Sequence, residues 1–122
     1  MPILDVEIVL KPGEMLTSDT ASRIAEAAGE VFASRPRGTW VRLRVLDSAL
    51  YAENESGPSV DVFPVFVSVL KSGIDADKLK EEASRLAETI ARVCNRPKEN
   101  VHILYETEAT GRVAFGGRLL EP

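Results

Sequence analysis

The chain has 122 residues, of which 44% are hydrophobic and 28% are charged, and its formal net charge is −4. This length and composition predict one globular domain. One cysteine and one histidine exclude an internal disulfide framework, disfavour a structural zinc site and fit a cytoplasmic protein, while the negative charge disfavours nucleic-acid binding. We find no apolar run of about 18 residues and no basic leader, so we expect neither a membrane span nor a signal peptide.

The first half of the chain predicts a strand, a helix and a second strand. Leu4, Val6, Ile8 and Leu10 alternate with the acidic residues Asp5 and Glu7, as in a half-buried strand, and a Pro-Gly pair follows at 12–13. A helix is expected to start near residues 17–20, where hydroxyl groups and Asp19 can cap its free N–H groups. Residues 41–45 then alternate valine or leucine with arginine, which predicts a strand with apolar side chains on one side and arginines on the other.

The second half repeats this order. Residues 62–70 are almost continuously apolar, which predicts a strand covered on both faces. Asp75 can cap a helix whose apolar stripe runs over residues 79–94. The remaining segments are a strand at 101–105, a polar loop at 47–59 with room for a short strand, and a glycine-rich turn or hairpin at 110–118.

The two halves also share sequence. Residues 9–13 (VLKPG) recur at 69–73 (VLKSG), residues 21–26 (ASRIAE) recur at 83–88 (ASRLAE), and Arg35-Pro36 recurs as Arg96-Pro97. These matches keep their order and are offset by 60, 62 and 61 residues, which indicates a duplicated unit. We therefore expect one domain over residues 1–122, made of a first repeat at about 1–60 and a second at about 61–122.

This order of elements predicts an α+β fold. Two fused βαβ units would form one mainly four-stranded sheet, with two helices on one of its faces. The other face would then need a cover, and a symmetric assembly of identical chains is the default way to provide it.

Pro2 is the first candidate for chemistry. If Met1 is removed, the chain begins with the secondary amine of proline; a free α-amino group has an ordinary pKa of about 7.7–8.0. Burial among apolar groups lowers the pKa of an amine because desolvation disfavours its charged form, so Pro2 could act as a general base near neutral pH. The alternative is structural, because proline is tolerated at the first position of a strand.

An anionic substrate would also need cationic or hydrogen-bonding partners. Arg42, Lys71 and Arg112 can bind a carboxylate, His102 can assist proton transfer, and Tyr51 in its polar loop can donate a hydrogen bond to an oxyanion. The structural alternatives are solvated surface charges and a histidine satisfied within its strand. No metal site is predicted.

The start Met1-Pro2-Ile3, the duplicated βαβ unit and the tail at 111–119 (GRVAFGGRL) resemble the tautomerase superfamily. The resemblance covers essentially the whole chain and implies a tautomerase/MIF-like fold, a homotrimer and no cofactor. It implies an isomerase that moves a proton in a small enol or 2-hydroxydienoate carboxylic acid. Pro2 would be the general base and acid, Arg42 and Lys71 would bind the carboxylate, and Val113 would line the pocket.

The chain also departs from some branches of this superfamily. Ala114 stands where one dehalogenase branch has a water-activating glutamate, and residues 35–40 lack the aspartate of the decarboxylase branch. These departures leave simple tautomerisation as the expected activity. Two alternatives remain open: a non-catalytic binding or scaffold protein of the same fold, and a ferredoxin-like sensor of small molecules, because that fold shares the order of elements.

Overall fold

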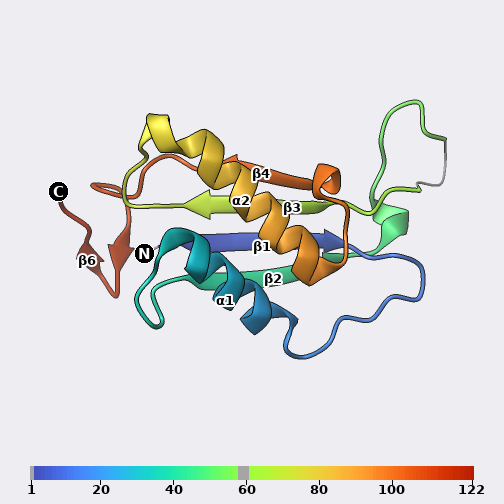
Figure 1. Ribbon diagram of the computed structural model, residues 1–122, viewed down its shortest axis with the longest axis horizontal. Helices are drawn as coiled ribbons and strands as arrows, with labels where there is room; N and C mark the ends of the chain where they lie inside the picture. The colour runs from blue at the N-terminus through green and yellow to red at the C-terminus, as the bar shows by residue number, and fades with distance from the viewer. Residues whose placement is uncertain (1, 58–60) are drawn as a thin grey trace.

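A computed structural model describes residues 2–57 and 61–122, and it places two helices on one face of a four-stranded sheet (Figure 1). The first unit contains β1 (Ile3–Val9), α1 (Thr20–Phe32) and β2 (Trp40–Leu46). The second contains β3 (Val65–Leu70), α2 (Ala76–Cys94) and β4 (Val101–Tyr105). A small hairpin of β5 (Ala114–Phe115) and β6 (Arg118–Leu119) follows, and two short 3₁₀ helices, η1 (Ser48–Leu50) and η2 (Lys98–Asn100), lie in the loops. The α+β prediction is therefore confirmed.

The sheet has the order β2-β1-β3-β4. The two outer pairs, β1 with β2 and β3 with β4, are parallel, whereas the central pair of β1 and β3 is antiparallel. The two units are thus joined by their first strands, which run in opposite directions. The start of β1 lies at one end of the sheet and the start of β3 at the other, so corresponding loops of the two units are at opposite ends.

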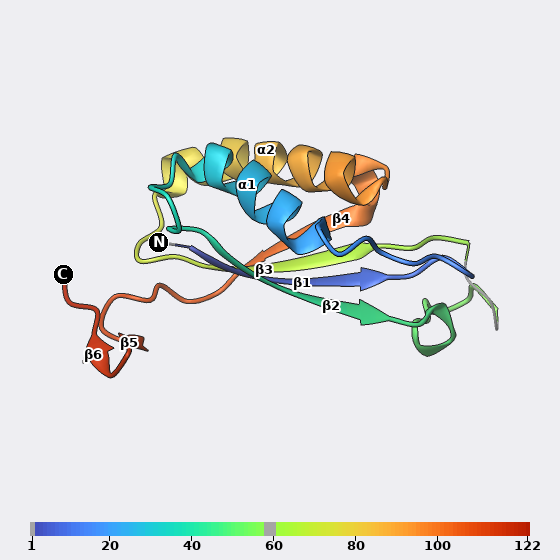
Figure 2. The same ribbon diagram turned by 90° about the horizontal axis from the view of Figure 1, so that it is seen from below.

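The hydrophobic core fills the layer between the helices and the sheet (Figure 2). Alternate residues of each central strand face this layer and are fully or almost fully buried: Leu4, Val6 and Ile8 of β1, and Val65, Val67 and Val69 of β3. These two sets are 61 residues apart, in agreement with the repeat seen in the sequence. Ile24 and Ala28 of α1 and Leu86 and Ile90 of α2 meet them from the helix side.

The predicted N-terminal capping side chain is confirmed for α2 and wrong for α1. The Asp75 carboxylate accepts a hydrogen bond from the backbone N–H of Asp77, as expected of a cap. Asp19 precedes α1 but its side chain makes no bond to a helix N–H, so the predicted cap is wrong. Its carboxylate instead accepts a hydrogen bond from the Thr17 hydroxyl, which removes it from the helix terminus.

Two predictions about the strands need correction. The strand expected over residues 62–70 begins at Val65, and its outward side is not covered within the chain, since Phe66 is 37% exposed. The predicted sides of β2 agree with the register, in which Val45 pairs with the core residue Ile8; Val45 is nevertheless 53% exposed, because β2 is an edge strand. The loop at 47–57 contains η1 and no strand; Ser59 and the expected repeat boundary at residue 60 lie outside the described residues.

The glycine-rich tail forms the predicted hairpin. Gly116 and Gly117 connect β5 and β6 with positive φ angles of 58° and 84°, a conformation that side chains with a Cβ rarely adopt. The Phe115 ring packs edge-on against Trp40, with centroids 5.7 Å apart. This contact holds the hairpin at the end of the sheet where β1 begins (Figure 1). Neither helix in the described parts of the chain has the length and apolar character needed to cross a bilayer.

Candidate functional site

Pro2 lies immediately before β1, at the residue for which burial was the condition for acting as a base. It is buried, and its carbonyl oxygen accepts a hydrogen bond from the backbone N–H of Trp40 at 3.0 Å. Pro2 alternates with Leu4 along the strand, so it lies on the helix side of the sheet. This position fixes the backbone of Pro2 beside the end of α1.

A cavity of about 510 Å³ opens next to Pro2. The end of α1 and the loop after it form one wall, which includes Phe32 and Arg35, and the segment after β3 forms another, with Lys71. Glu82 of α2 also lines it. The structure thus brings together two predicted site residues, Pro2 and Lys71, because the start of β1 is adjacent to the end of β3 in the antiparallel pair.

Lys71 is held in place by two neighbours. Its ammonium nitrogen donates a hydrogen bond to Glu82 Oε1 at 2.6 Å and lies 5.5 Å from the centre of the Phe32 ring, within the range of a cation–π contact. The Tyr105 hydroxyl donates to the other Glu82 oxygen at 2.8 Å. Burial and the Glu82 carboxylate raise the pKa of Tyr105 well above its usual range, so this hydroxyl keeps its proton and remains a donor.

Two residues of this cavity, Arg35 and Glu82, were not predicted as site residues from the sequence. Arg35 was seen only as part of a repeated motif, yet it lines the cavity; among residues 2–57 and 61–122 it forms no salt bridge. Glu82 was not considered. Its position between Leu79 and Leu86 on the inward side of α2 was the available signal, since a charged residue at helical spacing within an apolar stripe needs a partner.

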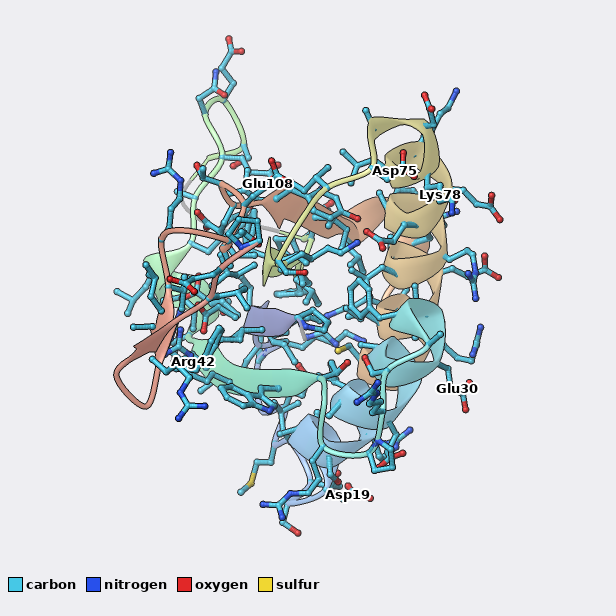
Figure 3. All side chains as sticks on the ribbon, turned by 90° about the vertical axis from the view of Figure 1, so that its left-hand side faces the viewer. Asp19, Glu30, Arg42, Asp75, Lys78 and Glu108 are labelled. Atoms are coloured by element: carbon cyan, nitrogen blue, oxygen red, sulfur yellow. The ribbon has the colours of Figure 1, made fainter. Side chains whose placement is uncertain are left out.

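Three other predicted residues lie on the opposite face of the sheet. Arg42, Arg112 and Val113 line a separate hollow of about 320 Å³ on the helix-free face. The Arg42 guanidinium donates to both carboxylate oxygens of Asp5, at 2.6 and 2.8 Å. This hydrogen bonding holds the pKa of Asp5 below its usual value, although burial opposes the shift. Figure 3 shows Arg42 on the side of the sheet away from the helices, next to the hairpin.

Tyr51 and His102 lie around Phe66, farther along the helix-free face. Their rings are 6.0 and 5.5 Å from the Phe66 ring, centroid to centroid. Phe66 pairs with Glu7 in the sheet, so this cluster is roughly 16 Å along β1 from Pro2 at about 3.3 Å per residue. The Tyr51 hydroxyl donates to Glu53 at 2.6 Å, and this bond, with burial, raises the pKa of Tyr51 to about 12. Within one chain neither side chain belongs to the Pro2 cavity.

In the second unit, the place that corresponds to the cavity beside Pro2 is occupied by the side chain of Arg96. Phe63, which is 61 residues after Pro2, accepts a hydrogen bond from Arg96 Nε through its carbonyl oxygen at 2.7 Å. The Arg96 side chain is 1% exposed and pairs with both oxygens of Glu14, at 2.7 and 2.9 Å. Carbonyl oxygens of Val9 and Cys94 accept its remaining bonds. This end of the sheet is therefore closed by a satisfied ion pair.

The cavity beside Pro2 thus combines a buried N-terminal segment, two cationic side chains and one carboxylate. Such a set can hold an anionic group close to the nitrogen of residue 2. Across residues 2–57 and 61–122, no group of three or more histidine, cysteine, aspartate or glutamate side chains is arranged to hold a metal ion.

No family model and no curated protein matches the sequence, but solved structures match its fold over nearly the whole chain. The macrophage migration inhibitory factor of Trichinella spiralis is 15% identical, with a TM-score of 0.69 over 96% of this chain and 98% of its own. A fused 4-OT, solved as a symmetric trimer, is 11% identical, with a TM-score of 0.74 over 96% and 94%.

A third structure is a malonate semialdehyde decarboxylase, FG41, which is 16% identical, with a TM-score of 0.64 over 93% of this chain and 90% of its own. At sequence identities of 11–16%, these matches show a shared fold rather than a shared activity. It agrees with the resemblance found in the start, the repeat and the tail of the sequence. The chain therefore has the fold of the tautomerase superfamily.

Proposed function

We propose that this chain, after removal of Met1, is a cofactor-free keto–enol tautomerase in which the Pro2 amine is the general base and acid. The observation that carries the proposal is the position of Pro2: it is buried at a cavity that also holds Lys71 and Arg35. An amine and two cations around one partly enclosed cavity suit an anionic substrate that must gain and lose a proton.

The amine of Pro2 would be neutral under ordinary conditions. Proline is small enough as a second residue for Met1 to be removed, which leaves a secondary amine. Both burial and the nearby positive charge of Arg35 disfavour a protonated amine and so lower its pKa from the value of about 7.7–8.0 that is ordinary for an α-amino group. The charges of Lys71 and Glu82 offset each other through their hydrogen bond, so this pair has little net effect on the amine.

The reaction transfers one proton within the substrate. In an enol acid such as phenylenolpyruvate, the Pro2 nitrogen takes the proton of the 2-hydroxyl group as the C–O bond becomes a carbonyl. The carbon–carbon double bond then takes that proton from the ammonium of Pro2 at C3, so the amine is restored and no co-reactant is needed. We assign Arg35 and Lys71 to the carboxylate, because a guanidinium can donate two parallel hydrogen bonds to it.

We further propose that the chain is a homotrimer. The helix-free face exposes apolar side chains, including Phe66 at 37% and Leu104 at 63%, and such a face favours burial against another subunit. The fused 4-OT of the same fold is described as a symmetric trimer. In such an assembly the residues on the helix-free face, namely Tyr51, Arg42, His102, Arg112 and Val113, would serve a neighbouring cavity or the interface.

The decisive experiment follows ketonisation of phenylenolpyruvate by its ultraviolet absorbance. Mass spectrometry first establishes that Met1 is absent. Pro2→Ala is then compared with wild type and with Pro12→Ala, a matched control at an exposed proline. We expect a loss of turnover only in Pro2→Ala. Absent turnover, or equal rates in all three proteins, would contradict the proposal and leave a binding or scaffold protein as the better explanation.

A further inference from the structure

We propose that Glu82 restricts the Pro2 cavity to ligands with a single carboxylate, because it cancels the charge of Lys71. This inference rests on the proposed function and names the substrate class of the same site. The two carboxylate-binding candidates, Arg35 and Lys71, differ in their surroundings, and that difference carries the argument.

Both carboxylate oxygens of Glu82 accept hydrogen bonds, one from Lys71 and one from Tyr105. Its Oε1 accepts a hydrogen bond from Lys71 at 2.6 Å, and its Oε2 accepts one from Tyr105 at 2.8 Å. Both donors are partly buried. Because each carboxylate oxygen already has a strong donor, Glu82 is poorly placed to exchange a proton with a substrate. Its role is electrostatic and positional: it fixes the Lys71 ammonium against Phe32 and balances its charge.

The net charge of the cavity follows from the few ionisable side chains that line it. Among the described residues that line it, the ionisable side chains are Arg35, Lys71 and Glu82, which sum to a net charge of +1 when each is ionised. One carboxylate neutralises this charge. A second carboxylate would have to compete with Glu82 for Lys71 or stay unpaired, and an unpaired charge in a partly enclosed site is costly.

Binding of unreactive acids tests this inference without requiring turnover. Phenylacetate and 4-carboxyphenylacetate share a ring and an acetate group, and differ by one carboxylate. Their dissociation constants are measured by ligand-observed NMR or calorimetry for wild type, Glu82→Gln and Glu82→Asp. Glu81→Gln is the matched control, because it removes the same charge from an exposed neighbouring position on α2. Circular dichroism establishes that each variant is folded.

We expect Glu82→Gln to shift the ratio of the two dissociation constants about tenfold toward the dicarboxylate, the scale of one unit charge in a partly hydrated site. Glu82→Asp keeps the charge and should keep most of the wild-type ratio. Tyr105→Phe leaves the charge count unaltered and should not change the ratio. Charges that another subunit brings to the cavity are the same in wild type and in each variant. They therefore do not alter the comparison of the ratio of dissociation constants between wild type and variant.

Two outcomes would overturn the inference. One is an unchanged ratio in Glu82→Gln; the other is an equal shift in the Glu81→Gln control. Failure of the proposed function has a different signature: phenylenolpyruvate would not turn over, yet the binding ratios would still respond to Glu82. If wild type and Glu82→Gln bind neither acid at millimolar concentration, the cavity is not a carboxylate site and both proposals are wrong.

Discussion

Removal of Glu14 should destabilise the protein through a residue far from the candidate site. Arg96 is almost completely buried, and its two strongest contacts are the bonds to the Glu14 carboxylate. Glu14→Ala leaves the guanidinium with three backbone carbonyls and no opposite charge. A buried charge that loses its partner is far more costly than the loss of a surface pair.

The expected size follows from this environment. Breaking a buried ion pair costs about 3–5 kcal/mol, and the 20% exposure of the Glu14 side chain places the cost near the lower end, at about 3 kcal/mol. With an unfolding entropy of about 2.1 cal/mol/K per residue over 122 residues, this loss lowers Tm by about 12 °C. An exposed glutamate such as Glu26 should change Tm by no more than about 2 °C.

The assay is thermal and urea unfolding by circular dichroism, at one fixed protein concentration because assembly affects Tm. Its pH dependence is a second readout. Hydrogen bonds from Arg96 hold the pKa of Glu14 below its ordinary value of 4.5, so the pair contributes its full stability above that pH. The contribution is lost as pH falls through the lowered pKa, and the difference between wild type and Glu14→Ala should shrink there.

A loss below about 1 kcal/mol at pH 7 would refute the reasoning, since it would mean that water or another group replaces the carboxylate at little cost. A difference that stays constant down to pH 3 would refute the assigned cause. Glu26→Ala supplies the baseline, because it removes a carboxylate from an exposed position of α1.

Three further predictions concern other parts of the molecule. Burial raises the pKa of Cys94 to about 11, so iodoacetamide at pH 8 should label it slowly in the folded protein and rapidly in urea; fast native labelling would contradict this burial. Tyr51, with a pKa near 12, and Tyr105, whose pKa is raised further, should give no tyrosinate absorbance at pH 10 while the protein is folded, and a normal titration near pH 10 would disprove both assignments. Leu104→Arg should dissociate the proposed trimer in sedimentation velocity, whereas Met15→Arg, at an exposed loop residue, should not; an intact Leu104→Arg trimer would place the interface elsewhere.

Most of the fold was predictable because local patterns and the repeat agree. Alternation over residues 4–10 and helical spacing over 79–94 each identify an element, and the offset near 61 residues relates the two units. The sequence could not show that the outward side of β3 is uncovered within one chain, because a continuous apolar run looks alike whether its cover comes from the chain or from a neighbour.

The candidate site was predicted only in part. Pro2 and Lys71 meet because two strand ends are adjacent, but Arg42 lies across the sheet. The alternation of side chains along the strands could have shown that Pro2 and Arg42 lie on opposite faces of the sheet. Pro2 is two residues before the core residue Leu4 and faces the helices, whereas Arg42 pairs with Asp5 on the other face. The role of Glu82 depends on the approach of α2 to the end of β3, a long-range contact that spacing along the chain does not specify.

The closed end of the sheet has a consequence for how this chain can change. In the duplication that we infer from the sequence, the two units have corresponding ends; Arg96 fills one of these ends with an ion pair, whereas a cavity remains at the other. Substitutions around Arg96 should therefore act mainly on folding, whereas substitutions around Pro2 should act mainly on the ligand binding proposed above. Because the ion pair lies at the opposite end of the sheet, substitutions in the lining of the Pro2 cavity leave the bonds between Arg96 and Glu14 intact.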